Sequence, residues 1–124
     1  RLLPGESPEE LLAGMKKAVD DDKVTFRTII SESSKESSPD SALFRAIRKV
    51  AAGRDPGAIV APAVLTSSTD SHYLRELGIA VYGFEPYRLG ENEERSHGND
   101  ERISVANVHF GLRFLYAVLQ ELDK

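Results

Sequence analysis

The feature that most constrains the fold of this chain is the alternation of short apolar runs with amphipathic segments. The runs at 24–29, 58–65 and 79–84 each have the length of a strand, and helical patterns lie between them. Residues 1 to about 30 fit a β-α-β order, and strands and helices alternate again from about residue 40. Because strands joined by helices pack as a layered sheet, the sequence predicts an α/β fold.

The helices are predicted from capping residues and from the spacing of apolar side chains. The first begins at Ser7, which can cap it, with Pro8 at the first helical position and Glu10 completing a capping box. The others are predicted from about Pro39 to Gly53, from His72 to Leu77, and from a Ser104 cap onward.

The final helix has the clearest apolar pattern in the chain. Its apolar residues advance in steps of three and four at Val105, Val108, Leu112, Leu115 and Leu119. Phe110, Phe114 and Tyr116 broaden the apolar surface. We therefore expect this helix to be buried on more than one side.

Composition narrows the class of function. A chain of 124 residues makes one ordinary domain or two small pieces, and its net charge of −4 argues against a nucleic-acid partner. No window approaches the roughly 20 consecutive apolar residues of a membrane span, and no targeting leader is recognisable. Because the chain has no Cys, a metal site here would use His and carboxylates.

Two features suggest a piece of a longer protein. The chain opens at Arg1 without Met, which we interpret as an entry partway through an apolar strand. An expression scar or a processed N-terminus is the alternative. The polar stretch 31–40 cannot pack into a core, so we expect a linker or an exposed crossing there.

The chain has three histidines, which are its candidate nitrogen ligands for a metal. His97 precedes Gly98 in a loop with Asp100 and Glu101, where a neutral imidazole could reach a cation. Spacing alone leaves a purely structural role for it open. His109 lies inside the last helix, and we expect it to be packed or half-exposed. The third, His72, opens the short helix.

Four ordered motifs resemble the C-terminal part of the zinc aminoacylase and carboxypeptidase G superfamily. That group also includes acetylornithine deacetylase, succinyl-diaminopimelate desuccinylase and the carnosine dipeptidases. The motifs are RLLPGESPEE at 1–10, STDSHY at 68–73, GIAVYGF at 78–84 and HGNDERI at 97–103. They cover essentially the whole chain in the family's order.

The resemblance implies a domain organisation. Residues 1–32 would be the C-terminal half of a ferredoxin-like lid, or dimerisation, domain, in β-α-β order. Residues 33–124 would be the C-terminal half of the α/β catalytic domain. Because the lid pairs between subunits in this family, we expect a homo-oligomer.

The resemblance also implies site residues. His97 matches a His that binds one of two zinc ions, although other divalent metals could replace zinc. Asp100 and Glu101 would support the site or simply favour the start of the following helix. His72 and Asp70 would bind substrate, but His72 stands where relatives have Arg. Because imidazole offers fewer donors than guanidinium, this departure puts the usual preference for a free carboxylate in doubt.

The family's other zinc ligands and its general-base Glu lie in an N-terminal half that this segment lacks. We therefore expect no catalytic residue here and no activity from the segment alone, but an amide hydrolase as the parent. Its substrates would be peptides or N-acyl amino acids, as for a carboxypeptidase, a dipeptidase or a deacylase. The alternatives are a noncatalytic binding or oligomerisation module and a breakdown product with no role of its own.

Overall fold

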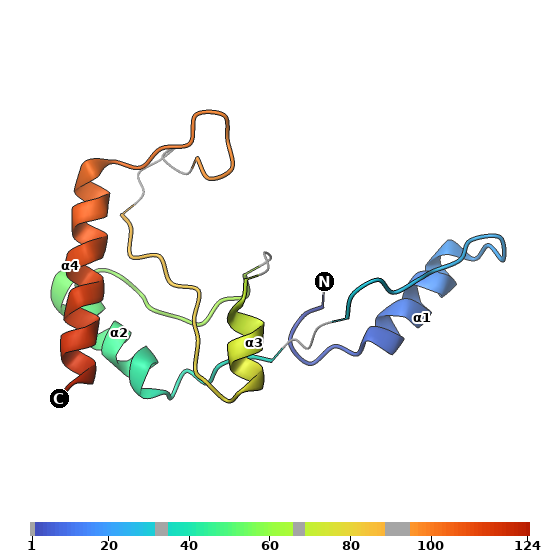
Figure 1. Cartoon of the computed structure of the whole chain (residues 1–124), viewed down its shortest axis with the longest axis horizontal. Helices are drawn as coiled ribbons and strands as arrows, with labels where there is room; N and C mark the ends of the chain where they lie inside the picture. Colours follow the sequence, from blue (N-terminus) through green and yellow to red (C-terminus); the bar gives the residue numbers. More distant parts are fainter. Residues whose placement is uncertain (1, 32–34, 66–68, 89–94) are drawn as a thin grey trace. The chain divides into compact units, whose positions relative to one another are not determined.

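The computed structural model describes residues 2–31, 35–65, 69–88 and 95–124. Its helices are α1 (Pro8–Val19), α2 (Ala42–Arg54), α3 (Ser71–Glu76) and α4 (Val105–Leu122) (Figure 1). The chain divides into two compact units. One comprises Arg1–Ser38 and Val64–Tyr82, with α1 and α3; the other comprises Pro39–Ala63 and Gly83–Lys124, with α2 and α4.

The start of α1 is held by its own polar side chains. The Ser7 hydroxyl accepts the backbone N–H groups of Glu9 and Glu10, and it donates to the Glu9 carboxylate at 2.7 Å. The same bond from Ser7 holds the pKa of the Glu9 carboxyl below its ordinary value. These contacts confirm Ser7 as the cap and Pro8 as the first helical residue. No residue of α1 is buried among the described residues.

The short helix α3 and the segment that follows it are tied together and to Ser37, which is distant in the sequence. The Arg75 guanidinium donates to the Val81 carbonyl from Nη2 at 3.0 Å and from Nε at 3.3 Å. The Ser37 hydroxyl donates to the same carbonyl at 2.9 Å and accepts the Val81 N–H at 3.0 Å. Gly78, at φ +78°, ends the helical stretch where the sequence predicted it.

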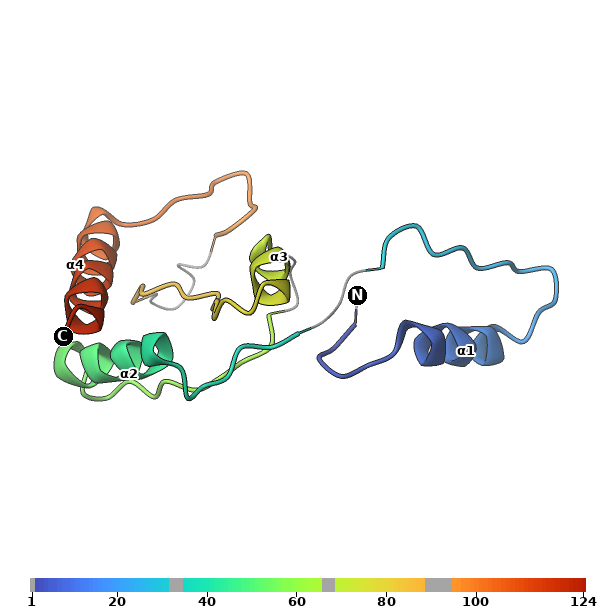
Figure 2. The same ribbon diagram turned by 60° about the horizontal axis from the view of Figure 1, so that its bottom comes forward.

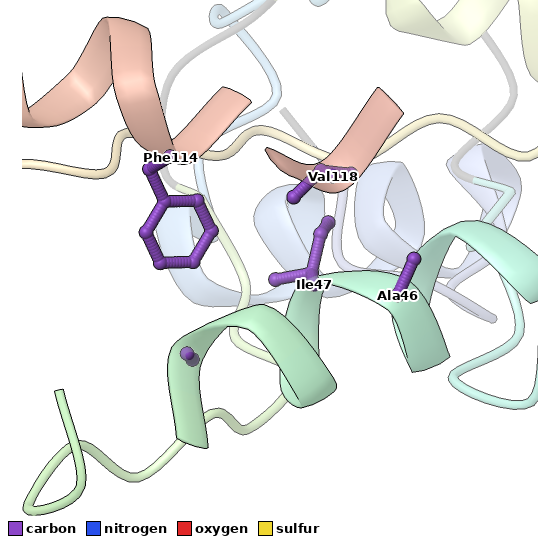
Figure 3. Close-up of a cluster of buried hydrophobic side chains, with 5 residues drawn as sticks. Ala46, Ile47, Phe114 and Val118 are labelled. Atoms are coloured by element: carbon purple, nitrogen blue, oxygen red, sulfur yellow. The ribbon is translucent and has the colours of Figure 1, made fainter. Parts of the chain in front are cut away.

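The core of the second unit lies between α2 and α4, which lie side by side in both views (Figures 1 and 2). Figure 3 shows Ile47 and Ala46 on α2 facing Val118 and Phe114 on α4. These four side chains and Ala51 are each at most 5% exposed. Partly buried apolar side chains surround them: Leu43, Val50, Val60, Phe84 and Phe110.

The buried face of α4 differs from the predicted one. Ser104 caps the helix as expected, accepting the Asn107 N–H at 3.2 Å. The buried residues are Asn107, Gly111, Phe114 and Val118, which also follow helical spacing. The predicted row is exposed, with Val105 at 71% and Leu112 at 62%. Burial of this helix on more than one side is therefore not found among the described residues.

The predicted α/β fold, including its β-α-β N-terminal half, is wrong: the described residues form helices and no strand. The apolar runs at 24–29, 58–65 and 79–84 are described as neither helix nor strand. Alternating apolar residues show which face of a run could be buried, but a strand also requires a neighbour with which to exchange backbone hydrogen bonds. Without that neighbour, Ile29 is 80% exposed and Ile59 is 93% exposed.

None of the described helices combines the length and the apolar character needed to cross a membrane.

Candidate metal-binding loop

His97 lies on an exposed turn before α4. Its backbone adopts the left-handed conformation, with φ +63°, which His tolerates better than most residues. The turn is closed by the Gly98 N–H, which donates to the Arg95 carbonyl at 3.2 Å. The imidazole is exposed and forms no hydrogen bond or ion pair with another described residue.

The carboxylate of Asp100 stabilises this turn from the other side of His97. It binds the Arg95 guanidinium at 2.7 Å and the Arg102 guanidinium at 3.3 Å. Because two guanidinium groups share the Asp100 carboxylate, this carboxylate links residues on both sides of His97. Glu101 is exposed and follows directly.

The base of the loop that carries His97 is closed by a pair of hydrogen bonds. The Arg88 backbone N–H donates to Asn107 Oδ1 at 2.9 Å, and Asn107 Nδ2 donates to the Arg88 carbonyl at 3.2 Å. Asn107 is 6% exposed and is the only buried polar residue among those described. The sequence analysis missed both residues, although a polar residue in phase with Gly111, Phe114 and Val118 was a usable signal.

The Arg88 side chain also contacts the C-terminal end of α2. Its Nη2 donates to the Arg54 carbonyl at 2.9 Å, and its Nε lies 3.2 Å from Asp55 Oδ2. The guanidinium carbon lies 4.6 Å from the centre of the Phe110 ring, within cation–π range. Arg88 is thereby anchored to both helices of the core, α2 and α4.

The predicted substrate residues lie in the other unit. His72 is half-buried on α3, and its Nδ1 lies 3.1 Å from the Thr69 carbonyl. Because a carbonyl only accepts, Nδ1 carries the proton in this contact, and a neutral ring would then have an acceptor at Nε2. Asp70 precedes the helix, but its side chain forms no cap hydrogen bond. Thr69 Oγ1 instead accepts the Ser71 N–H at 3.3 Å.

Comparison with protein families identifies the chain. Residues 6–121 match the model of peptidase family M20/M25/M40. The chain belongs to this family. That assignment confirms the superfamily recognised from the four motifs.

Several curated proteins are similar to this M20 chain. It is 27% identical over 127 residues to the "Probable carboxypeptidase S-like 2" of Dictyostelium discoideum, covering 100% of the chain and 24% of that relative. It is 30% identical over 128 residues to the human "N-fatty-acyl-amino acid synthase/hydrolase PM20D1", covering 99% of the chain and 26% of that relative. The chain thus spans about a quarter of the length of these relatives. No solved structure gives a significant match.

The described residues of the M20 chain do not by themselves form a metal site. Among the described residues, no group of three or more His, Asp or Glu side chains is placed to hold an ion. The exposed imidazole of His97 is of a type that could serve as one donor to such a site. A stable site therefore requires donors from beyond these residues.

Proposed function

We propose that this chain is part of a metal-dependent amide hydrolase, in which His97 supplies one zinc ligand. The observation that carries the proposal is the exposed His97 imidazole on a braced turn, in a chain that matches the M20 family over residues 6–121. The names of the relatives, a carboxypeptidase-like protein and an N-fatty-acyl-amino acid hydrolase, support hydrolysis of an amide bond.

The roles of the chain's own residues follow from their chemistry. Two divalent ions, zinc in the first instance, would supply Lewis acidity at the amide carbonyl and activate water. His97 would hold one ion through a neutral nitrogen, and Asp100 would keep the turn in place through Arg95. The general base would come from outside these 124 residues, so the isolated segment would be inactive.

The substrate would be a peptide or an N-acyl amino acid bound partly by His72 and Asp70. Because His72 Nδ1 donates its hydrogen to the Thr69 carbonyl, Nε2 of the neutral ring is an acceptor and cannot donate to a substrate carboxylate. Carboxylate recognition by His72 would therefore be weaker than recognition by a permanently charged Arg.

The domain roles are part of the same proposal. Residues 1–32 would belong to a lid, or dimerisation, domain, and residues 33–124 to the catalytic domain. The face of α1 supports pairing with a second copy of the protein, since Leu11, Met15 and Val19 are each more than 40% exposed. In sizing experiments on the full-length protein, Met15→Glu should shift a dimer towards the monomer, whereas Lys16→Glu should not.

The hydrolase proposal is tested in the full-length protein by comparing His97→Ala with His109→Ala. His109 is a matched control because it is an exposed histidine on α4, twelve positions away. We expect His97→Ala to lose bound zinc and activity on a panel of dipeptides and N-acyl amino acids, and His109→Ala to retain both. Activity that survives a chelator, or full zinc content in His97→Ala, would contradict the proposal.

A further inference from the structure

A second apolar face of α4 is left largely uncovered by the described residues of its unit. It is distinct from the buried face, which contains Phe114 and Val118. Six residues form it, and we call them the outer row. Each is at least 40% exposed: Val105, Val108, Leu112, Leu115, Leu119 and Leu122. Continuous apolar surfaces of this kind usually mark an interaction site.

The spacing of the outer row indicates the kind of structure that covers it. Its members are separated by alternating steps of three and four positions, so the pattern repeats every seven residues. This is the period of a seam between two helices that pack nearly parallel or antiparallel, and the stripe is narrower than a helix usually buries in a globular core. The row runs the whole length of the 18-residue helix, about 27 Å. A single helix with a matching apolar seam fits this shape.

The outer row continues the core between α2 and α4. Three of its members lie on the side nearer to the buried face and are 40–45% exposed, whereas the three farther around the helix are 62–71% exposed. The nearer three are Val108, Leu115 and Leu122. The apolar surface is therefore continuous, and a helix packed on the row would enlarge the existing core.

The charges of α4 favour a partner from the same protein over a second copy. Helix pairs between separate chains are commonly specified by charged residues beside the seam. In α4 only Arg113 and Glu121 carry a full charge, and neither flanks the outer row within the helix. The flanking positions hold Gly111 and Val118 on one side and His109 and Tyr116 on the other. The chain spans about a quarter of the length of its relatives, so a parent of similar length would supply further polypeptide.

We infer that the outer row of α4 is the docking face for an amphipathic helix of the parent protein, contributed by polypeptide outside these 124 residues. The docked helix would complete the hydrophobic core that α2 and α4 begin. Docking at this row requires neither a bound metal nor His97 as a ligand.

The first experiment places a photo-cross-linker on the outer row of the full-length protein. p-Benzoylphenylalanine replaces Leu112 in one variant and Leu119 in another, and it replaces Arg113, which faces away from the row, in the control. Mass spectrometry identifies the cross-linked peptides. Protein assembled from isotopically labelled and unlabelled chains distinguishes cross-links within a chain from those between chains.

The cross-links from Leu112 and Leu119 should fall within one chain, on a segment outside these 124 residues. The two positions are seven residues apart, or about 10.5 Å along the axis of α4, so a partner helix should react at sites about seven residues apart. The control at Arg113 should not react with that segment.

The second experiment measures how much the row contributes to stability. Leu119→Ala removes an apolar side chain from the row, and Gln120→Ala is the matched control because Gln120 is an exposed neighbour on a different side of the helix. In the full-length protein, Leu119→Ala should lower the unfolding temperature by about 5 °C or more, independently of protein concentration. Gln120→Ala should leave the unfolding temperature nearly unchanged.

Three results would each overturn the inference. Cross-links between chains would assign the outer row to a second copy. Cross-link sites about three residues apart would assign it to a strand. An absence of cross-links from both positions, together with an unchanged unfolding temperature in Leu119→Ala, would mean that the row stays exposed in the full-length protein.

Discussion

The rings of Phe84 and Phe114 lie with their centroids 5.4 Å apart and their planes inclined at 50°. This tilted arrangement is favourable for aromatic pairs. Phe114 is 4% exposed on the inner face of α4, and Phe84 lies on the segment that leads to Arg88. The pair therefore attaches the approach to the His97 loop to the core between α2 and α4.

Replacing Phe114 by Ala should destabilise the second unit strongly. The change removes a buried ring that contacts Phe84 and Phe110, and substitutions of this kind cost about 3–5 kcal/mol. Chemical denaturation monitored through α2 and α4 would measure the loss. Arg113→Ala is the control, because Arg113 is exposed one position earlier on the same helix. Equal effects of the two changes would contradict the assigned core.

The helix ends were predictable because their determinants are local. Ser7 and Ser104 each accept backbone N–H groups two or three residues ahead, so the sequence contains both partners of the bond. The start of α2 was predicted near Pro39, but Ser41 is the cap and Ala42 the first residue. Several serines precede this helix, and the residue pattern alone does not distinguish which of them caps it.

The sheet and the buried face of α4 were not predictable in the same way. A strand depends on a partner that is often distant in sequence, and an apolar run does not specify whether one is present. For α4, two rows of residues satisfy helical spacing. The row with Gly111 faces inward, where the absence of a side chain admits the Tyr87 ring: a Cβ on Gly111 would lie 3.1 Å from Tyr87 Cε1.

The same difference between local and long-range determinants applies to the candidate site. His97 and His72 could be named from the sequence because their residue types and neighbouring motifs point to binding chemistry. Arg88 could not, since a bond between its backbone and an amide nineteen positions away leaves no short-range pattern. For Asn107 the only signal was a polar side chain in phase with Gly111, Phe114 and Val118. Their connection depends on how the chain packs.

Replacing Ser7 by Ala should shorten α1 from its N-terminus. The variant loses an acceptor for the Glu9 and Glu10 N–H groups, and such a loss typically costs about 1 kcal/mol. Because α1 has no buried residue to compensate, NMR chemical shifts should show reduced helicity over its first turn. Lys17→Ala, an exposed change within the same helix, should leave those shifts unchanged. A first turn that stays fully helical in Ser7→Ala would show that this cap is dispensable.

Replacing Glu121 by Gln should lower stability at neutral pH and have little effect in strong acid. Bonds from Lys124 and then Lys49 hold the pKa of the Glu121 carboxyl below its ordinary value. A carboxyl with a depressed pKa in the folded state contributes stability above its unfolded pKa, and this contribution is lost as pH falls through the folded pKa. The effect should be small because the pair lies at the surface. Urea midpoints at pH 7 and below pH 3 measure it, and the exposed Glu85→Gln is the control. A deficit that persists unchanged in acid would contradict the ionic origin.

Replacing His72 by Arg should favour substrates with a free carboxylate, if His72 contacts that group as proposed. A guanidinium is charged at every working pH and can bind a carboxylate through two donors, whereas His72 shares one nitrogen with the Thr69 carbonyl. In the full-length enzyme, KM for an N-acyl amino acid should fall several-fold, and KM for the matching amide should not. Parallel changes in both would place His72 away from the carboxylate.

Replacing Gly98 by Ala should weaken metal binding without unfolding the protein. A Cβ at this position would lie 3.3 Å from the Arg95 carbonyl oxygen, which also accepts the Gly98 N–H. Because the obstacle is backbone rather than a flexible side chain, the turn must shift by a few tenths of an ångström, and the imidazole of His97 should shift with it. Zinc affinity of the full-length protein, measured by chelator competition, should fall several-fold. Gly53→Ala is the matched control: nothing lies within 4 Å of its Cβ, and a helical Ala should stabilise α2 by about 0.5–1 kcal/mol. Unchanged affinity in Gly98→Ala would mean that the closed turn does not determine where His97 binds its ion.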